Sequence, residues 1–163
     1  MSVTDELLAH ARRYAASFDK GDLPLPPGKH VAVVACMDAR LNVYGVLGLS
    51  EGDAHVIRNA GGVVTQDELR SLAISQRLLG TVEIILIHHT DCGMLTFQDD
   101  EFRRTIQDET GIKPTWASEA FSDVDADVRQ NIARVHAETA IPHKHSVRGF
   151  VYDVTNGTLR EVT

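Results

Sequence analysis

Two short clusters in this 163-residue sequence carry side chains that could hold a metal ion. One runs Cys36-Met37-Asp38-Ala39-Arg40, and the other runs His88-His89-Thr90-Asp91-Cys92-Gly93. His89 and Cys92 are separated by two residues, so one turn can direct both side chains at the same ion, and Cys36 could supply a third ligand. A Cys₂His set suits Zn²⁺, and three protein ligands leave the fourth position open, as in catalytic zinc sites. The alternative is that the cysteines are buried only for packing.

The second cluster offers two adjacent histidines, and only one of them can easily meet Cys92. Neighbouring side chains on an extended strand point to opposite faces, so His88 and His89 cannot both turn toward the same cysteine. The His-x-x-Cys spacing selects His89 as the ligand. His88 is near enough in the sequence to be a candidate proton shuttle, although a buried structural imidazole is the interpretation that we favour.

The first cluster also places a carboxylate and a guanidinium beside the cysteine. Cys36, Asp38 and Arg40 alternate along the chain and therefore share one face if this segment is extended. An arginine can hold a carboxylate through two hydrogen bonds and keep it ionised and oriented. Such a pair could accept a hydrogen bond from zinc-bound water. The competing interpretation is an ordinary surface salt bridge, which would be preferred if this pair stood alone.

Both clusters follow segments that are predicted to be buried strands. Residues 31–35 (VAVVA) and 82–89 (VEIILIHH) are short apolar runs of the kind found in strands buried on both faces. Residues 54–62 have the pattern of another strand that ends in a glycine turn. Ligand sites of open parallel sheets lie at the carboxyl ends of strands, so we expect the two clusters to share one edge of the sheet.

Helices and turns around these strands complete the expected architecture. The predicted helices cover residues 4–18, 41–48, 67–80, 97–110 and 122–138, and a Pro-rich linker covers 21–29. Residues 148–163 predict a strand, an Asn156-Gly157 turn and a second strand. We therefore predict an α/β fold with a mostly parallel central sheet flanked by helices, an N-terminal helical arm and a C-terminal hairpin. Residues 1–163 form a single zinc-binding domain in this prediction, with residues 1–28 as arm and linker.

Composition and charge argue against several classes of protein. A net charge of −7 is unlike that of a non-specific nucleic-acid binder, which normally carries a basic surface. No apolar run approaches the roughly 18 residues of a membrane span, and the first residues, MSVTDELLAH, lack the apolar core of a signal peptide. We therefore expect a cytoplasmic protein with no nucleic-acid or membrane partner. In a reducing compartment the two cysteines are expected to be thiols or metal ligands, not a disulfide.

Three motifs, in order along the chain, resemble those of the β-class carbonic anhydrases. They read Cys36-Met37-Asp38-Ala39-Arg40, Arg58-Asn59-Ala60-Gly61 and His89-Thr90-Asp91-Cys92-Gly93. The resemblance implies a zinc ion bound by Cys36, His89 and Cys92, and a catalytic dyad of Asp38 and Arg40. It further implies a closed state in which Asp38 takes the fourth zinc position. An obligate homodimer or a dimer of dimers, with each site at a subunit interface, is also implied.

The function expected from the site and the resemblance is the reversible hydration of CO₂ to bicarbonate and a proton. Zinc acidifies its bound water, Asp38 accepts a hydrogen bond from the resulting hydroxide, and Arg40 holds Asp38 in place. Two alternatives stay open at this point. Related zinc hydrolases with similar ligands act on carbon disulfide or carbonyl sulfide. A non-catalytic, zinc-stabilised binding protein is the second alternative, and it would need a fourth firm ligand to the metal.

Overall fold

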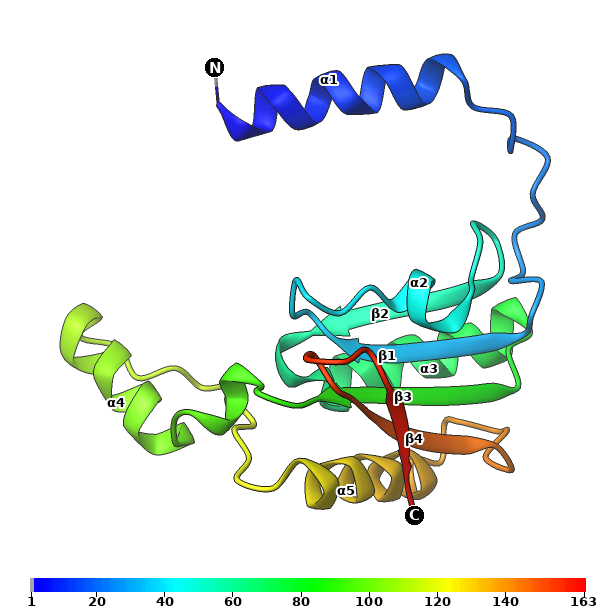
Figure 1. The fold of residues 1–163 in the computed structure, drawn as a ribbon. Coiled ribbons are helices and arrows are strands. Elements are labelled where there is room, and N and C mark those ends of the chain that lie inside the picture. The colour runs from blue at the N-terminus through cyan, green and yellow to red at the C-terminus, as the bar shows by residue number, and fades with distance from the viewer. Residues whose placement is uncertain (1) are drawn as a thin grey trace.

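A five-stranded sheet in the order β2-β1-β3-β4-β5 forms the centre of the computed structural model, which describes residues 2–163 (Figure 1). The first four strands of this order are parallel, and β5 runs antiparallel to β4. The strands are β1 (Val31–Cys36), β2 (Ala54–Asn59), β3 (Glu83–His89), β4 (Val147–Tyr152) and β5 (Leu159–Val162). This arrangement confirms the predicted fold class. Met1, the first residue of the predicted arm, lies outside the described residues.

Within residues 2–163, five α-helices and two short 3₁₀ turns connect the strands. They are α1 (Val3–Ala16), α2 (Val43–Leu47), η1 (Ala60–Gly62), α3 (Gln66–Leu79), η2 (Gly93–Leu95), α4 (Asp99–Thr110) and α5 (Val124–Ala137). Each predicted helix is present. The ends of α3 are set by capping, since Thr65 caps its first turn together with Glu68 and Gly80 ends it in the left-handed conformation. In this part of the chain no helix has the length and apolar character that a membrane crossing requires.

The central strands are buried because helices and loops cover both faces of the sheet. All six residues of β1 are buried, as its unbroken apolar run predicts. On one face, Val34 packs in a cluster with Leu72 of α3 and Val135 of α5. On the other face, Val33 belongs to a cluster that includes Val43 of α2 and both cysteines. The second cluster therefore joins the apolar core directly to the predicted metal ligands.

Helix α1 projects away from the rest of the chain (Figure 1). None of its residues is buried, and its apolar side chains stay open to solvent, with Leu7 61 % and Tyr14 54 % exposed. Helix α1 and the start of the linker contact the rest of the chain at Glu51. The Glu51 carboxylate accepts a hydrogen bond from the Tyr14 hydroxyl at 3.2 Å and pairs with Lys20 at 2.5 Å. Most helical stability in proteins comes from packing of an apolar face. Within one chain, α1 lacks that packing.

The C-terminal hairpin is present, but its connection is wider than a two-residue Asn-Gly turn. β4 and β5 pair antiparallel from Tyr152↔Leu159 inward, so six residues separate the strands. Asp153 organises this loop, since its carboxylate accepts from the Thr155 amide at 2.8 Å and its carbonyl oxygen accepts from the Gly157 amide at 2.8 Å. Gly157 has a φ of +75°, the left-handed conformation that glycine allows.

Candidate metal centre

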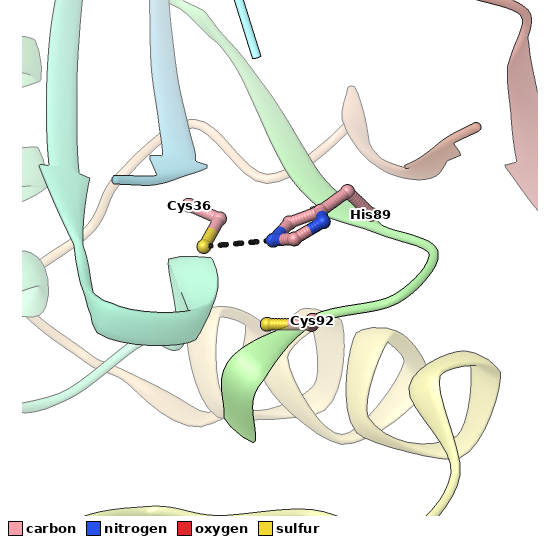
Figure 2. Close-up of side chains that lie close together, drawn as sticks. All are labelled: Cys36, His89 and Cys92. Carbon is pink, nitrogen blue, oxygen red and sulfur yellow. Dashed lines mark hydrogen bonds between the residues drawn. The ribbon is translucent and has the colours of Figure 1, made fainter. Parts of the chain in front are cut away.

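β1 and β3 are neighbours in the sheet, so their carboxyl ends bring the two sequence clusters to one edge. Cys36 is the last residue of β1, His89 is the last residue of β3, and Cys92 follows in the turn before η2. One potential ligand atom from each of these side chains lies within 4.8 Å of the other two (Figure 2). Among residues 2–163 this is the one group of three or more His, Cys, Asp or Glu side chains found close enough to share a metal ion.

The imidazole of His89 is oriented by the turn that follows it. Its Nδ1 lies 2.8 Å from the carbonyl oxygen of Thr90, so Nδ1 carries the proton and donates it. Its Nε2 therefore has a free lone pair, and it lies 3.2 Å from Cys36 Sγ (Figure 2). A hydrogen bond from one ring nitrogen to a backbone carbonyl is a common way to fix the tautomer and direction of a metal-binding histidine.

The three side chains are buried and their potential ligand atoms converge, which gives them the character of metal ligands. Cys36, His89 and Cys92 are 4 %, 0 % and 3 % exposed. Hydrogen bonding from Cys92, supported by His89, lowers the pKa of the Cys36 thiol despite its burial. The pKa of Cys92 is raised because its proton bonds to Cys36 and because it is desolvated. A Cys₂His set that converges in this way fits Zn²⁺, which would bind once both cysteines have lost their thiol protons and the imidazole is neutral.

Asp38 and Arg40 form the bidentate pair that alternation along the chain suggested. Arg40 donates through Nε to Asp38 Oδ1 at 3.0 Å and through Nη2 to Asp38 Oδ2 at 2.8 Å. These hydrogen bonds hold the pKa of the Asp38 carboxyl well below its usual range. Asp38 Oδ2 is also 3.6 Å from His89 Nε2. Asp38 and Arg40 therefore lie directly beside the donor cluster, which consists of Cys36, His89 and Cys92, and they do not form an isolated surface pair.

Two further residues support the dyad, and the sequence pattern assigns neither of them a role. Arg58 of β2 donates to the carbonyl oxygen of Cys36 at 2.7 Å and to that of Asp38 at 2.8 Å. Asp91 contacts Arg40 from the other side, with its Oδ2 2.8 Å from Nη1. Both residues lie inside the three motifs described above. A contact between residues this far apart in the sequence produces no helical or strand-like repeat that would predict it.

A cavity of about 360 Å³ opens beside the donor cluster. The three candidate ligands and Asp38 line one part of it, and the rest of its lining includes the apolar residues Met94 and Phe97. A small uncharged molecule gains from an apolar wall and needs few polar contacts. The cavity therefore suits a small apolar substrate that approaches the position where the three ligands converge.

His88 points away from the candidate ligands, as its place on the strand next to His89 requires. It is completely buried, and its Nε2 lies 2.7 Å from Asp127 Oδ2 of α5. Asn131 donates to the same carboxylate oxygen at 2.9 Å. The Nδ1 atom of His88 has no hydrogen-bond partner within the described part of the chain. These contacts match a structural imidazole that ties β3 to α5, and they offer no exposed route for a proton shuttle.

Gly62 lies against β1 and β3 close to the candidate ligands, and these two strands leave no room for a side chain there. It has a φ of +72°, and a Cβ there would lie 2.7 Å from the Cys36 amide nitrogen and the Ile87 carbonyl oxygen. We expect Gly62→Ala to destabilise the fold by about 2–4 kcal/mol, because overpacking costs ~1–3 and the left-handed conformation ~1. Urea unfolding measures this change. Gly48→Ala is the control, since Gly48 has a φ of +62° with open space around it. Equal losses in the two variants would contradict the steric argument.

A buried Cys₂His donor set beside an Asp–Arg pair, at the carboxyl edge of a mostly parallel sheet, defines an α/β protein with a candidate catalytic metal centre. Comparison with known proteins specifies it further. The chain belongs to the carbonic anhydrase family: the family model described as "Carbonic anhydrase" matches residues 31–139.

Curated relatives and solved structures agree with this assignment. The chain is 63 % identical over 163 residues to "Beta-carbonic anhydrase 1" of Mycobacterium tuberculosis, covering 100 % of this chain and 99 % of the relative. A carbonic anhydrase structure from Streptococcus mutans matches with a TM-score of 0.93 and 41 % identity, covering 100 % and 99 %. A protein named "Carbon disulfide hydrolase" from Acidithiobacillus thiooxidans is 32 % identical, covering 83 % of this chain and 78 % of its own length.

Proposed function

We propose that this protein catalyses the reversible hydration of CO₂ to bicarbonate and a proton. The observation that carries the proposal is the convergence of three candidate ligands, within 4.8 Å of one another, beside a carboxylate that Arg40 holds at 2.8 Å. The name of the relative at 63 % identity over the full chain points to the same activity.

The metal is Zn²⁺ in this proposal, with Cys36, His89 and Cys92 as its ligands. When bound by three protein ligands, Zn²⁺ lowers the pKa of water and so supplies hydroxide near neutral pH. The chain's own contribution is a buried donor set, one imidazole held in a single tautomer, and an open approach from the adjoining cavity.

Asp38 orients the nucleophile, and Arg40 keeps Asp38 ionised and directed at the site. Asp38 can accept a hydrogen bond because its pKa is held low and its carboxylate stays charged. Arg40 fixes that carboxylate through two parallel hydrogen bonds, which limits its rotation. CO₂ would occupy the apolar side of the cavity, near Met94 and Phe97. In a closed state, Asp38 would leave Arg40 and serve as a fourth ligand.

Stopped-flow measurement of CO₂ hydration by the zinc-loaded protein tests this function. We expect a rate far above the uncatalysed reaction, and a much smaller or absent release of sulfide from carbon disulfide. The relatives named carbon disulfide hydrolase make this second substrate the necessary comparison. Efficient hydrolysis of carbon disulfide without CO₂ hydration would replace the proposal by that alternative. A zinc-loaded protein inactive on both substrates would favour a non-catalytic binding protein.

We further propose that residues 1–163 form one domain and that the working unit is a cytoplasmic homodimer or dimer of dimers. The exposed apolar face of α1 supports the oligomer, because such a face is stabilised when another surface covers it. A second copy of the chain is the partner that we propose for it.

Deleting residues 1–20 is expected to raise the dimer dissociation constant about tenfold or more, which corresponds to roughly 1.4 kcal/mol. Burial of a single leucine side chain contributes at least that much. Analytical ultracentrifugation over a range of protein concentrations measures the change. The control is Lys20→Ala, which breaks the salt bridge to Glu51 but keeps the apolar face. A truncated chain that dimerises as well as the full chain would remove α1 from the interface.

A further inference from the structure

Arg40 contacts two acidic residues, and the second of them lies between two of the candidate ligands in the sequence. Nη1 of Arg40 donates to Asp91 Oδ2 at 2.8 Å, and Nη2 donates to the Asp91 carbonyl oxygen at 3.0 Å. The other edge of the guanidinium holds Asp38. Arg40 therefore links the loop after β1 to the turn after β3, and these are the two segments that carry the dyad and the ligands.

The backbone of Asp91 shows that this contact is built into the turn. Asp91 has a φ of +53°, the left-handed conformation that glycine adopts freely and that aspartate tolerates better than most residues. The conformation lets the carbonyl oxygen and the carboxylate of one residue reach the same guanidinium. An aspartate at this position adds a carboxylate contact to Arg40 that glycine could not make.

The exposure of the Arg40 side chain explains why a second contact is needed to fix its orientation. The Arg40 side chain is 47 % exposed, while that of Asp38 is only 17 % exposed. A single half-exposed ion pair contributes little, because water and side-chain entropy oppose it, so it is several contacts together, including that to the Asp91 carbonyl oxygen, that fix the guanidinium. Contacts on both edges of the planar guanidinium leave it one orientation, and that orientation presents Nε and Nη2 to Asp38.

We propose that Asp91 is a positioning residue that holds Arg40 in the orientation needed to retain Asp38. This inference rests on the proposed function, because Asp38 is the catalytic carboxylate only in that reaction. The Asp91 side chain is 78 % exposed and its carboxylate contacts Arg40, so Asp91 acts through Arg40 and not on the substrate.

Asp91→Gly and Asp91→Asn in the zinc-loaded protein separate this role from a purely structural one. Glycine removes the carboxylate and tolerates the positive φ, while asparagine keeps an acceptor oxygen and also tolerates it. We expect Asp91→Gly to speed hydrogen exchange of the Arg40 Nε proton, followed by ¹⁵N-edited NMR, about two- to fivefold. kcat and kcat/KM should fall by a similar factor with KM unchanged, since only positioning is lost. Asp91→Asn should restore most of both.

Asp67→Asn is the matched control, because it removes a charge from another exposed Asp–Arg pair, with Arg70 Nη2 2.8 Å from Asp67 Oδ1. It should leave the Arg40 exchange rate, the zinc content and the activity unchanged. Unaltered Arg40 exchange in Asp91→Gly would overturn the proposal. A loss of activity that only parallels a loss of zinc would also overturn the proposal. Asp91 would then stabilise the turn that carries Cys92 and would not orient Arg40. The exchange measurement needs no turnover, so failure of the proposed function would not be mistaken for failure of this inference.

Discussion

Cys92→Ala is expected to leave the protein with almost no bound zinc and to lower CO₂ hydration at least a thousandfold. Three ligands hold the metal in the proposed site, and removal of one thiolate leaves two ligands and an unfilled space. The size of the loss follows from the pKa of water, which a catalytic zinc ion lowers from about 15.7 to about 7. Elemental analysis of the purified variant measures zinc per chain, and stopped-flow assays measure the rate.

His143→Ala is the control for this experiment. His143 belongs to a His-x-His sequence that could bind metal by itself, but it is exposed and is not among the described residues that form the candidate site. The control should keep its full zinc content. Retention of zinc by Cys92→Ala would place the metal elsewhere, and loss of zinc from His143→Ala would point to a site in that loop.

Asp38→Asn is expected to lower kcat/KM roughly a hundredfold while the zinc content stays the same. Asparagine has nearly the same shape but lacks the charge that orients a reacting group, and removal of one such group typically costs two to three orders of magnitude (~10²–10³). Asp125→Asn is a matched control, because Asp125 also accepts two hydrogen bonds from one arginine, Arg160, at 2.7 and 3.0 Å. Equal activity of Asp38→Asn and the native protein would reject Asp38 as the catalytic carboxylate.

The sheet was predictable because its strands are buried on both faces. A fully buried strand must be apolar at every position, so β1 stands out from the surrounding sequence as the run VAVVAC. A cysteine and a histidine that end such strands are buried with them, and these are side chains that can bind a metal ion. This pattern located Cys36 and His89, and parallel pairing of β1 with β3 placed them at one edge.

The contacts of Arg58 and Asp91 could not be predicted in the same way. Arg58 reaches the main chain of a neighbouring strand, and Asp91 meets an arginine that is 51 residues away in the sequence. Neither contact repeats with a helix or strand period, so each depends on how the strands are placed in three dimensions. The positive φ of Asp91 is also hidden, because the sequence there offers no glycine as a signal.

The hairpin loop and α1 show a second limit. Asn156-Gly157 indicates a turn, but the number of residues around it depends on the hydrogen bonds that Asp153 makes to the loop. For α1, the amphipathic pattern predicts a helix over residues 4–18; the helix runs from Val3 to Ala16, and the capping box that begins it is made by Ser2 and Asp5. Its direction relative to the sheet is set by the linker and by the contacts of Tyr14 and Lys20 with Glu51.

The pairing of β1 with β3 also governs when the site can form as the chain folds. His89 and Cys92 lie in one turn, but Cys36 is 53 residues before His89. Parallel strands need a crossover between them, and contacts of such separation become favourable only after the entropy of closing a long loop has been overcome. A nascent chain therefore holds at most two of the three donors together. The third donor, the Cys36 sulfur, arrives with the central strand pair, so tight metal capture during refolding marks the formation of the sheet itself.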